Sequence, residues 1–367
     1  MRFPEFSGEW EKCSIQDYGE VVTGNTPPTS HAEYYENGSY LWASPADLGI
    51  NKNITETKTK LSLSGFKKTR SIPKGSVLVT CIGSTIGKMG MAAETMSSNQ
   101  QINSIVVNDK SNSDFVYYAI CRAFPRYLSE VAVQAVPILS KSNFEKLPNY
   151  TTCRDEQDKI GYFLNLLDER IATQNKIIED LKLLKSAIAE TVFNNMKGHL
   201  TNLSAICNIV KGKQVNGEEL SEKGKYYVMN GGITPSGYYD QCNTPPNTIS
   251  ISEGGNSCGY VQYNKSSFWS GGHCYTLQDI TSGVDTQYLF HYLKRYESHI
   301  MNLRIGTGLP NIQKKDLENF RIALPPSNNQ KEISTCLTAI EDKIMVEVKW
   351  LDSAQREKQH LLRQMFI

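Results

Sequence analysis

The chain has 367 residues, enough for two or three domains, and its 39% hydrophobic and 21% charged residues are those of an ordinary globular protein. Its 39 Lys and Arg against 38 Asp and Glu leave a net charge of +1, which argues against a nonspecific binder of polyanions and still permits a local basic face. No apolar run reaches the roughly 18 residues of a membrane span, and the first residues lack the apolar core of a signal peptide, so we expect a cytoplasmic protein with no membrane partner.

The first region, residues 1–150, is predicted to be mixed and rich in strands. A loop must follow the Val-Thr-Gly at residues 22–24, because two adjacent prolines remove backbone donors and fix φ there. Apolar and β-branched residues bounded by turn residues predict strands over 75–82 and 102–107. The stretch 114–122 reads as a helix that carries two tyrosines.

A glycine-rich segment at residues 83–88, GSTIGK, lies between the two predicted strands. It looks like a phosphate-binding P-loop, but one residue is missing between the glycines, and Met89 stands where a Ser or Thr would hold magnesium. We therefore interpret it as a tight glycine turn between strands. A nucleotide-dependent enzyme that uses this loop remains a distant alternative, and it would require the isolated chain to bind ATP.

The clearest basic run falls in the same region. It holds six cations with no acid between them: Lys58, Lys60, Lys67, Lys68, Arg70 and Lys74. Solvated surface is the ordinary meaning of such a run. Contact with phosphate is the alternative.

A long helix is predicted over residues 156–193. Its apolar residues recur in steps of three and four and form one seam: Ile160, Leu164, Leu167, Ile171, Ile178, Leu181, Ile188 and Val192. Acidic residues near its start favour helix initiation at the positive end of the helix dipole. Polar Gln174 and Lys185 interrupt the seam.

The region after this helix, residues 199–325, repeats the first region in the same order. Matched segments are 210–212 with 22–24, 249–259 with the strand and glycine turn at 78–87, 285–289 with 114–118, and 309–312 with 136–139. The loops between these segments differ strongly in sequence. One framework with divergent loops is what a protein with two different binding targets would have.

A second long helix, residues 329–366, aligns with the first without a gap. Its seam residues occupy the matching positions: Ile333, Leu337, Ile340, Ile344, Leu351, Ala354, Leu361 and Met365. Even the interruptions match, since Glu347 and Lys358 stand where Gln174 and Lys185 stood, which indicates a tandem duplication. We predict that the two helices pair antiparallel within one chain, with a Gln/Glu–Lys contact across the seam, whereas ordinary coiled-coil segments most often serve oligomerisation.

The nine cysteines are scattered, with no Cys-x-x-Cys pair, so neither a disulfide framework nor a zinc ribbon is indicated. The nearest approach to a ligand cluster is His273-Cys274 with Cys258 and Cys242, and its spacing fits no common metal site. We therefore predict no metal and no cofactor in this chain.

Together these features resemble the specificity subunit of type I restriction-modification systems. The residues that carry the resemblance are the opening RFPEFSGEW at 2–10, the Val-x-Gly followed by a Pro/Thr loop, LWASPADL at 41–48, PKGSVL at 73–78, and LPP at 324–326 before Gln330. Each piece is weak alone, and their order along a duplicated domain-plus-helix layout makes the resemblance specific over the whole chain.

The resemblance implies an α+β protein with two target recognition domains, residues 1–150 and 199–325. A central spacer helix at 151–198 and a distal spacer helix at 326–367 would form an antiparallel coiled coil with pseudo-twofold symmetry. Each domain would read one half of a bipartite, asymmetric site in double-stranded DNA. A helix of about 38 residues is roughly 57 Å long, enough to hold the two domains about one DNA turn apart.

The resemblance also implies a subunit without catalytic activity, and we find no adenine-flipping Asn-Pro-Pro-aromatic motif, no complete P-loop and no clear nuclease cluster in the sequence. Methylation would come from two methyltransferase (modification) subunits that use S-adenosylmethionine. Restriction subunits that use ATP and Mg would join through the complex, or be missing in a methylation-only system. The alternative from another class is a non-catalytic scaffold whose two domains bind protein or glycan.

Base readout needs Arg or Lys for guanine and Asn or Gln for adenine, with phosphate contacts to fix the register. For the first domain we expect backbone contacts from Lys58, Lys60, Lys67, Lys68 and Arg70, and groove contacts from Thr26, Ser84, Thr85, Lys88, Asn99, Gln100 and Gln101. For the second domain the candidates are Lys211, Lys213, Gln214, Asn230, Ser252, Asn256, Tyr260, Arg304 and Lys314. For each residue the alternative is an exposed loop side chain that contacts nothing.

Overall fold

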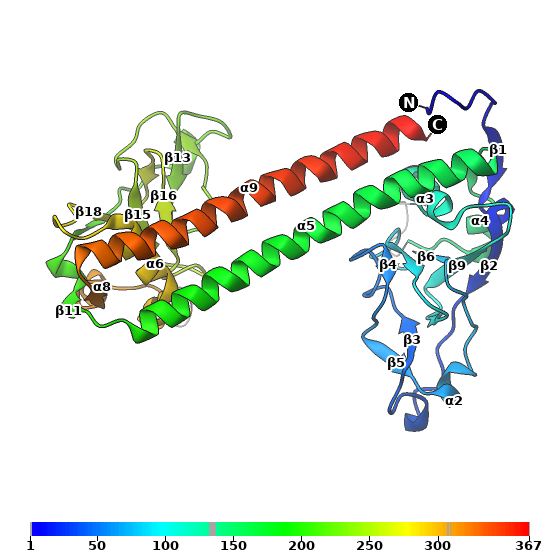
Figure 1. Cartoon of the computed structure of the whole chain (residues 1–367), viewed down its shortest axis with the longest axis horizontal. Helices are drawn as coiled ribbons and strands as arrows, with labels where there is room; N and C mark the ends of the chain where they lie inside the picture. Colours follow the sequence, from blue (N-terminus) through cyan, green and yellow to red (C-terminus); the bar gives the residue numbers. More distant parts are fainter. Residues whose placement is uncertain (1, 132–136, 307, 309, 367) are drawn as a thin grey trace. The chain divides into compact units, whose positions relative to one another are not determined.

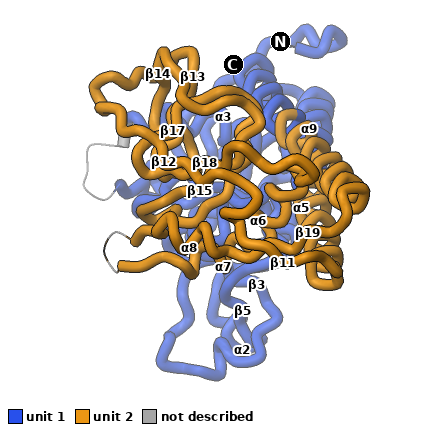
Figure 2. The backbone as a smooth tube through the Cα atoms, turned by 90° about the vertical axis from the view of Figure 1, so that its left-hand side faces the viewer, with its two compact units in different colours: residues 1–175, 350–367 blue, residues 176–349 orange. Residues whose placement is uncertain are grey.

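The computed structural model describes residues 2–131, 137–306, 308 and 310–366 (Figure 1). The predicted match of 309–312 with 136–139 lies partly outside these residues, because it begins at Leu309 and Val136. The chain divides into two compact units (Figure 2). Unit 1 comprises residues 1–175 with 350–367, and unit 2 comprises residues 176–349.

The main sheet of unit 1 has the strand order β2-β9-β6-β7-β4. Its strands are β2 (Gly19–Thr23), β9 (Ile102–Val107), β6 (Val77–Thr80), β7 (Met89–Ala92) and β4 (Asn53–Ile54). Neighbours are antiparallel except that β4 runs parallel to β7. A smaller sheet joins β5 (Thr59–Leu61), β3 (Tyr40–Ala43) and β8 (Ser97–Ser98), and β1 (Glu11–Ser14) pairs with β10 (Pro148–Thr151).

The helix α3 (Ser113–Val131) packs against the main sheet and supplies much of the core of unit 1. Buried Phe115 and Tyr118 from α3 meet Val77 and Val79 from β6. The predicted helix at 114–122 is therefore confirmed and extends further than the pattern indicated. The short helices of this unit are α1 (Ile15–Tyr18), η1 (Ala32–Tyr34), α2 (Leu63–Phe66) and α4 (Lys141–Glu145).

Unit 2 repeats this architecture. Its main sheet has the order β12-β18-β15-β16, formed by β12 (Asn208–Lys211), β18 (Cys274–Gln278), β15 (Thr248–Ser252) and β16 (Val261–Asn264). The smaller sheet is β14 (Tyr238–Tyr239), β13 (Tyr226–Met229) and β17 (Trp269–Ser270), and β11 (His199–Asn202) pairs with β19 (Arg321–Leu324). The helices are η2 (Leu203–Ala205), η3 (Gly217–Glu219), α6 (Thr286–Arg295), α7 (Glu297–Met301) and α8 (Lys314–Glu318).

The strands β12, β18, β15 and β16 of unit 2 correspond in order to β2, β9, β6 and β7 of unit 1, and β4 is an additional strand in unit 1. The repeated Val-x-Gly has the same packing reason in both copies. A Cβ on Gly24 would lie 2.3 Å from the carbonyl oxygens of Ser98 and Asn99, and one on Gly212 would lie 2.2 Å from that of Gly271. Only glycine lets the end of the first main-sheet strand approach the neighbouring backbone this closely.

Two long helices, α5 (Arg154–Asn195) and α9 (Ser327–Met365), extend the core of each unit. In unit 1 the start of α5, at Ile160 and Leu164, shares a core with Met365 at the end of α9 and with Phe366. In unit 2 the end of α5, at Phe193, shares a core with Leu337 near the start of α9. Opposite ends of the helices meet in each unit, so they pair antiparallel, and the predicted α+β fold with two strand-rich domains and long helices is confirmed.

The predicted seam positions are all buried or half-buried. In α5 these are Ile160, Leu164, Leu167, Ile171, Ile178, Leu181 and Ile188, and in α9 they are Ile333, Leu337, Ile340, Ile344, Leu351 and Leu361. None of the helices in the described part of the chain is long and apolar enough to cross a membrane. The domain boundaries at 150, 198 and 325 stay a prediction.

The two lysines that interrupt the seam have acidic partners that we did not predict. Lys185 Nζ lies 3.2 Å from Glu341 in unit 2, and Lys358 pairs with Asp168 in unit 1. Asp168 and Glu341 occupy matching positions of the two helix copies, so the two ion pairs are equivalent under the duplication. Each pair links the two helices inside one unit.

Candidate nucleic-acid interface

Three groove candidates of unit 1 meet where β2 ends and β9 begins. Thr26 Oγ1 donates to Gln100 Oε1 at 2.6 Å. The backbone oxygen of Gln101 accepts from the N–H of Cys81, at the end of β6. Asn99 is buried, and its side-chain amide makes two hydrogen bonds to Gln101: it donates to Gln101 Oε1 and accepts from the Gln101 N–H. Asn99 therefore supports this corner without reaching the surface.

The glycine-rich segment joins β6 to β7 as a turn. Gly83 and Gly87 take positive φ, 93° and 89°, and Gly83 lies beside the Gln101 side chain. The turn therefore places Ser84 and Thr85 near the corner formed by Thr26, Gln100 and Gln101. Lys88 lies elsewhere, because its side chain packs near Gly49.

The turn connects two antiparallel strands and no helix follows it, so the predicted tight glycine turn is confirmed and the distant P-loop alternative is wrong. A P-loop needs a helix whose N-terminus holds the phosphates.

Hydrogen bonds from the Asn25 side chain hold the backbone of Lys68 and Arg70, two residues of the basic run, at the same corner. The Asn25 side chain donates to the carbonyl oxygen of Lys68 at 2.9 Å and accepts from the N–H of Arg70 at 2.9 Å. Arg70 Nη1 also donates to the carbonyl oxygen of Thr23 at 2.6 Å. The exposed side chains of Lys67 and Lys68 and the exposed Arg70 thus sit next to the loop that carries Thr26.

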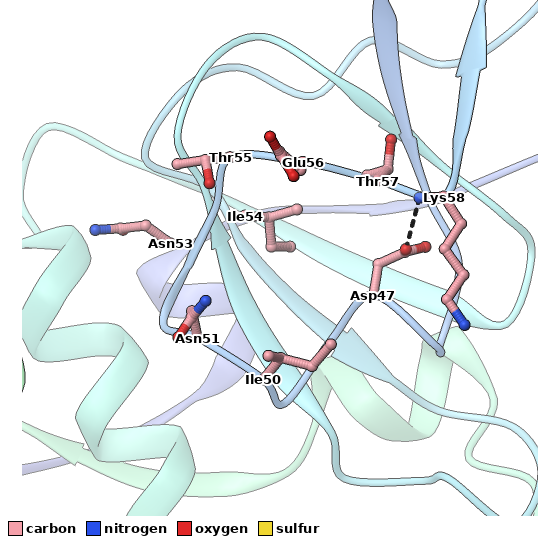
Figure 3. A pocket seen from close by; sticks show the side chains of 9 residues that line it. All are labelled: Asp47, Ile50, Asn51, Asn53, Ile54, Thr55, Glu56, Thr57 and Lys58. Atoms are coloured by element: carbon pink, nitrogen blue, oxygen red, sulfur yellow. Dashed lines mark hydrogen bonds between the residues drawn. The ribbon is translucent and has the colours of Figure 1, made fainter. Parts of the chain in front are cut away.

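Lys58 lies apart from this corner and lines an open cavity of about 360 Å³ (Figure 3). Its lining is Asp47, Ile50, Asn51, Asn53, Ile54, Thr55, Glu56, Thr57 and Lys58. Asp47 accepts from the Lys58 N–H at 2.9 Å and from the N–H and hydroxyl of Ser44. The carboxylate therefore holds the loop in shape. Lys60 and Lys74 are exposed.

The corresponding corner of unit 2 holds a charged cluster around Glu253. Lys211 Nζ lies 2.5 Å from Glu253 Oε1, and Tyr275 donates its hydroxyl to the same oxygen at 3.1 Å. His273 Nδ1 lies 3.6 Å from Glu253 Oε2. Burial, followed by the Glu253 charge, raises the pKa of Tyr275, so the phenol stays a neutral donor.

Two more candidates of unit 2 lie at this cluster. Asn230 Oδ1 accepts from the backbone N–H of His273 at 3.1 Å, and Gln214 lies against Gly272. Lys213 is exposed, and its backbone oxygen accepts from the Trp269 indole at 2.8 Å.

The remaining candidates are more dispersed. Asn256 and Arg304 are exposed, and Lys314 Nζ lies 3.7 Å from Glu318 within α8. Tyr260 faces α6, where the Lys294 ammonium lies 3.9 Å from its ring centroid. Ser252 is buried and donates to the carbonyl oxygen of Gly231, so it cannot serve as an exposed contact.

The backbone frame of the two corners is the same. The N–H of Glu253 donates to the carbonyl of His273, as that of Cys81 does to Gln101. The β12–β18 register pairs Lys211 with Tyr275, and the β2–β9 register pairs Thr23 with Asn103. Four matched positions thus carry Thr23, Cys81, Gln101 and Asn103 in unit 1 and Lys211, Glu253, His273 and Tyr275 in unit 2.

The chemistry of the two sets differs. In unit 1 the Thr23 hydroxyl donates to Asn103 Oδ1 at 2.6 Å, and burial raises the pKa of Cys81 to about 12, so its thiol is neutral. In unit 2 the same positions hold a cation and a carboxylate. We did not predict Glu253 or His273 as parts of an interface, because their contact depends on a strand register that the sequence does not display.

No group of three His, Cys, Asp or Glu side chains that could hold a metal ion occurs among the described residues. His273 and Cys258 both take part in the Glu253 cluster. The Cys258 thiol donates to the Glu253 carbonyl at 3.0 Å.

A frame used twice with different side chains at matched positions defines a protein built from two copies of one domain. The family model for the type I restriction modification DNA specificity domain matches residues 7–183 and 200–352, one match for each copy. The chain belongs to this family.

Among curated proteins, the chain is 30% identical over 151 residues to the type I restriction enzyme HindI specificity subunit of Haemophilus influenzae, covering 40% of this chain and 32% of that protein. It is 30% identical over 190 residues to the MjaIX specificity subunit of Methanocaldococcus jannaschii, covering 48% and 42%. In both relatives the match spans less than half of the protein.

Among solved structures, a type I restriction-modification S subunit from M. genitalium has the same fold, with a TM-score of 0.75 at 20% identity, covering 98% of this chain and 96% of that one. A chain from a study of complex assembly in the type I R-M system aligns with a TM-score of 0.57 at 16% identity, covering 96% of both.

Proposed function

We propose that the chain is the DNA sequence-specificity subunit of a type I restriction-modification complex, and that each unit reads one half of a bipartite, asymmetric site. The observation that carries the proposal is the pair of matched corners. The same four backbone positions carry uncharged side chains in unit 1 and a charged cluster in unit 2. Half of these side chains are buried, but Thr23 and Gln101 in unit 1 and Lys211 and His273 in unit 2 reach the surface. Such side chains can present different donors and acceptors to base edges without changing the fold.

The basic side chains near these corners support a DNA ligand. Lys67, Lys68 and Arg70 in unit 1 and Lys213 in unit 2 are exposed beside loops that carry amide side chains. Phosphate contacts position a protein on the duplex, and amides and cations read base edges. Exposed cations therefore lie beside the loops from which groove contacts are expected.

The helices have a separate role in the proposal. We infer that α5 and α9 set the length of the spacer between the half-sites and dock two methyltransferase subunits. The chain itself is non-catalytic and binds no cofactor. S-adenosylmethionine is used by the modification subunits, and ATP and Mg by restriction subunits where these join the cytoplasmic complex.

A domain exchange tests the proposal. Residues 1–150 are replaced by the equivalent domain of another family member, and the hybrid is expressed with its modification partner. Single-molecule sequencing of methylated adenines should show one half-site changed and the other retained. A chain that binds no DNA in a gel shift with the partner present would favour the protein- or glycan-binding scaffold, and a change in both half-sites would contradict the division of labour between units.

A further inference from the structure

The Glu253 carboxylate is nearly buried at the end of β15, and two exposed side chains rest on it. Its side chain is 10% exposed, against 54% for Lys211 and 64% for His273. Removing a carboxylate from water costs several kcal/mol unless partners compensate. Oε1 has Lys211 and Tyr275, whereas Oε2 is buried and has no hydrogen-bond donor among the described residues.

The fold does not need a carboxylate at this position. Cys81 takes the matching place in unit 1, with the same backbone hydrogen bonds on both sides, and its side chain is a buried neutral thiol. A costly group that the frame can omit serves something other than folding. Here it orients Lys211 and His273.

In this orientation Lys211 and His273 keep hydrogen-bonding groups on their exposed side that Glu253 does not use. A Lys ammonium has three donors, and Glu253 takes one of those of Lys211. The backbone of His273 is held by Asn230 at 3.1 Å, and its Nδ1 faces Glu253, so Nε2 is the ring nitrogen available to a ligand. Because Glu253 balances the Lys211 charge, attraction to phosphate is weak and directed hydrogen bonding dominates.

We propose that Lys211 and His273, oriented by Glu253, determine the sequence specificity of the second domain by recognising a guanine in the major groove. The proposal rests on the proposed function. Guanine offers two adjacent acceptors, O6 and N7, to a cation such as Lys. Unit 1 has Gln101 at the His273 position, and an amide that turned to the groove would favour adenine, so the same frame would read different bases in the two units.

The experiment uses the full chain with its modification subunits. Binding is measured to the methylated motif of the wild type and to duplexes with each base pair of the second half-site replaced, at several salt concentrations. Lys211→Ala should lower discrimination at one guanine position about tenfold or more, and leave the first half-site and the salt slope unchanged. Lys213→Ala is the matched control, with the same lost charge two residues away. Lys213→Ala should weaken binding to all DNA sequences alike, and it should reduce the slope of log affinity against log salt concentration by about 0.9.

Two further variants separate reading from folding. His273→Ala removes a side chain that is 64% exposed and should lower discrimination at the same position or its neighbour. Glu253→Gln keeps the shape but releases Lys211, and should lower discrimination there without a new base preference. The loss in His273→Ala is that of a base contact, so affinity for unrelated DNA should stay the same. The effect of Glu253→Gln is one of positioning, so discrimination must fall, while affinity for unrelated DNA should rise because the Lys211 charge is no longer balanced.

The inference is overturned if Lys211→Ala and His273→Ala keep full discrimination, or if Lys211→Ala behaves like Lys213→Ala. In either case the wild-type complex would still methylate a bipartite site. If the wild-type complex shows no bipartite preference at all, the proposed function fails first.

Discussion

Lengthening both long helices between the units tests the proposed spacer role. The boundary between the units falls after Asn175 in α5 and before Trp350 in α9. Seven residues inserted at both places lengthen each helix by about 10 Å, at 1.5 Å per residue. DNA rises about 3.4 Å per base pair. The unspecified gap of the methylated motif should therefore grow by about three base pairs, and both half-sites should stay unchanged.

An insertion of seven residues preserves the apolar seam, because seven residues are one heptad. An insertion in α5 alone is the matched control. It moves Lys185 and Asp168 out of step with Glu341 and Lys358, so it should lower stability and activity without producing a new gap. The assay is single-molecule sequencing of methylated adenines in cells that also express the modification partner. Altered half-sites at an unchanged gap would refute the reasoning.

Three more predictions concern stability. Lys52→Ala removes a side chain that is 7% exposed and bonded to Asp114, Tyr118 and Asn165, and it should cost about 3 kcal/mol in urea unfolding, whereas exposed Lys60→Ala should cost little. Gly212→Ala should cost about 1–3 kcal/mol and weaken readout of the second half-site, whereas Gly217→Ala, with open space around it, should do neither. Burial, with a smaller effect of Lys185, lowers the pKa of His291 from 6.5 to about 3, so the unfolded chain takes up the proton first as pH falls. The free energy of unfolding should then drop by about 2 kcal/mol from pH 7 to pH 5, and His291→Gln should flatten this slope.

The duplication could be predicted because its signals are periodic and local. The seams of α5 and α9 repeat every three or four residues, and a shared exception such as Lys185 with Lys358 is visible in a plain alignment. The strands at Val77–Thr80 and Ile102–Val107 are also local patterns, and both are confirmed. Such features depend on residues close in sequence, where propensity and periodicity act.

Contacts between distant strands could not be predicted in the same way. Glu253 meets Lys211 and His273 only because β15, β12 and β18 are neighbours in one register, and a slip of one residue would turn these side chains to the other face. The acidic partners of Lys185 and Lys358 were missed for a related reason. The repeat shows which rungs match between copies, but not which rungs face each other across an antiparallel pair.

The two-helix frame also determines what a transferable recognition domain must contain. The core of unit 1 includes Ile160 and Leu164 from the start of α5, as well as Met365 and Phe366. Burying each such side chain contributes about 1.5–3 kcal/mol. A donor domain placed on residues 1–150 alone would have to pack against these four side chains, which belong to the recipient. Exchanges should therefore succeed between relatives that keep matching apolar residues at these positions, and fail by unfolding where a donor core is too large or too small.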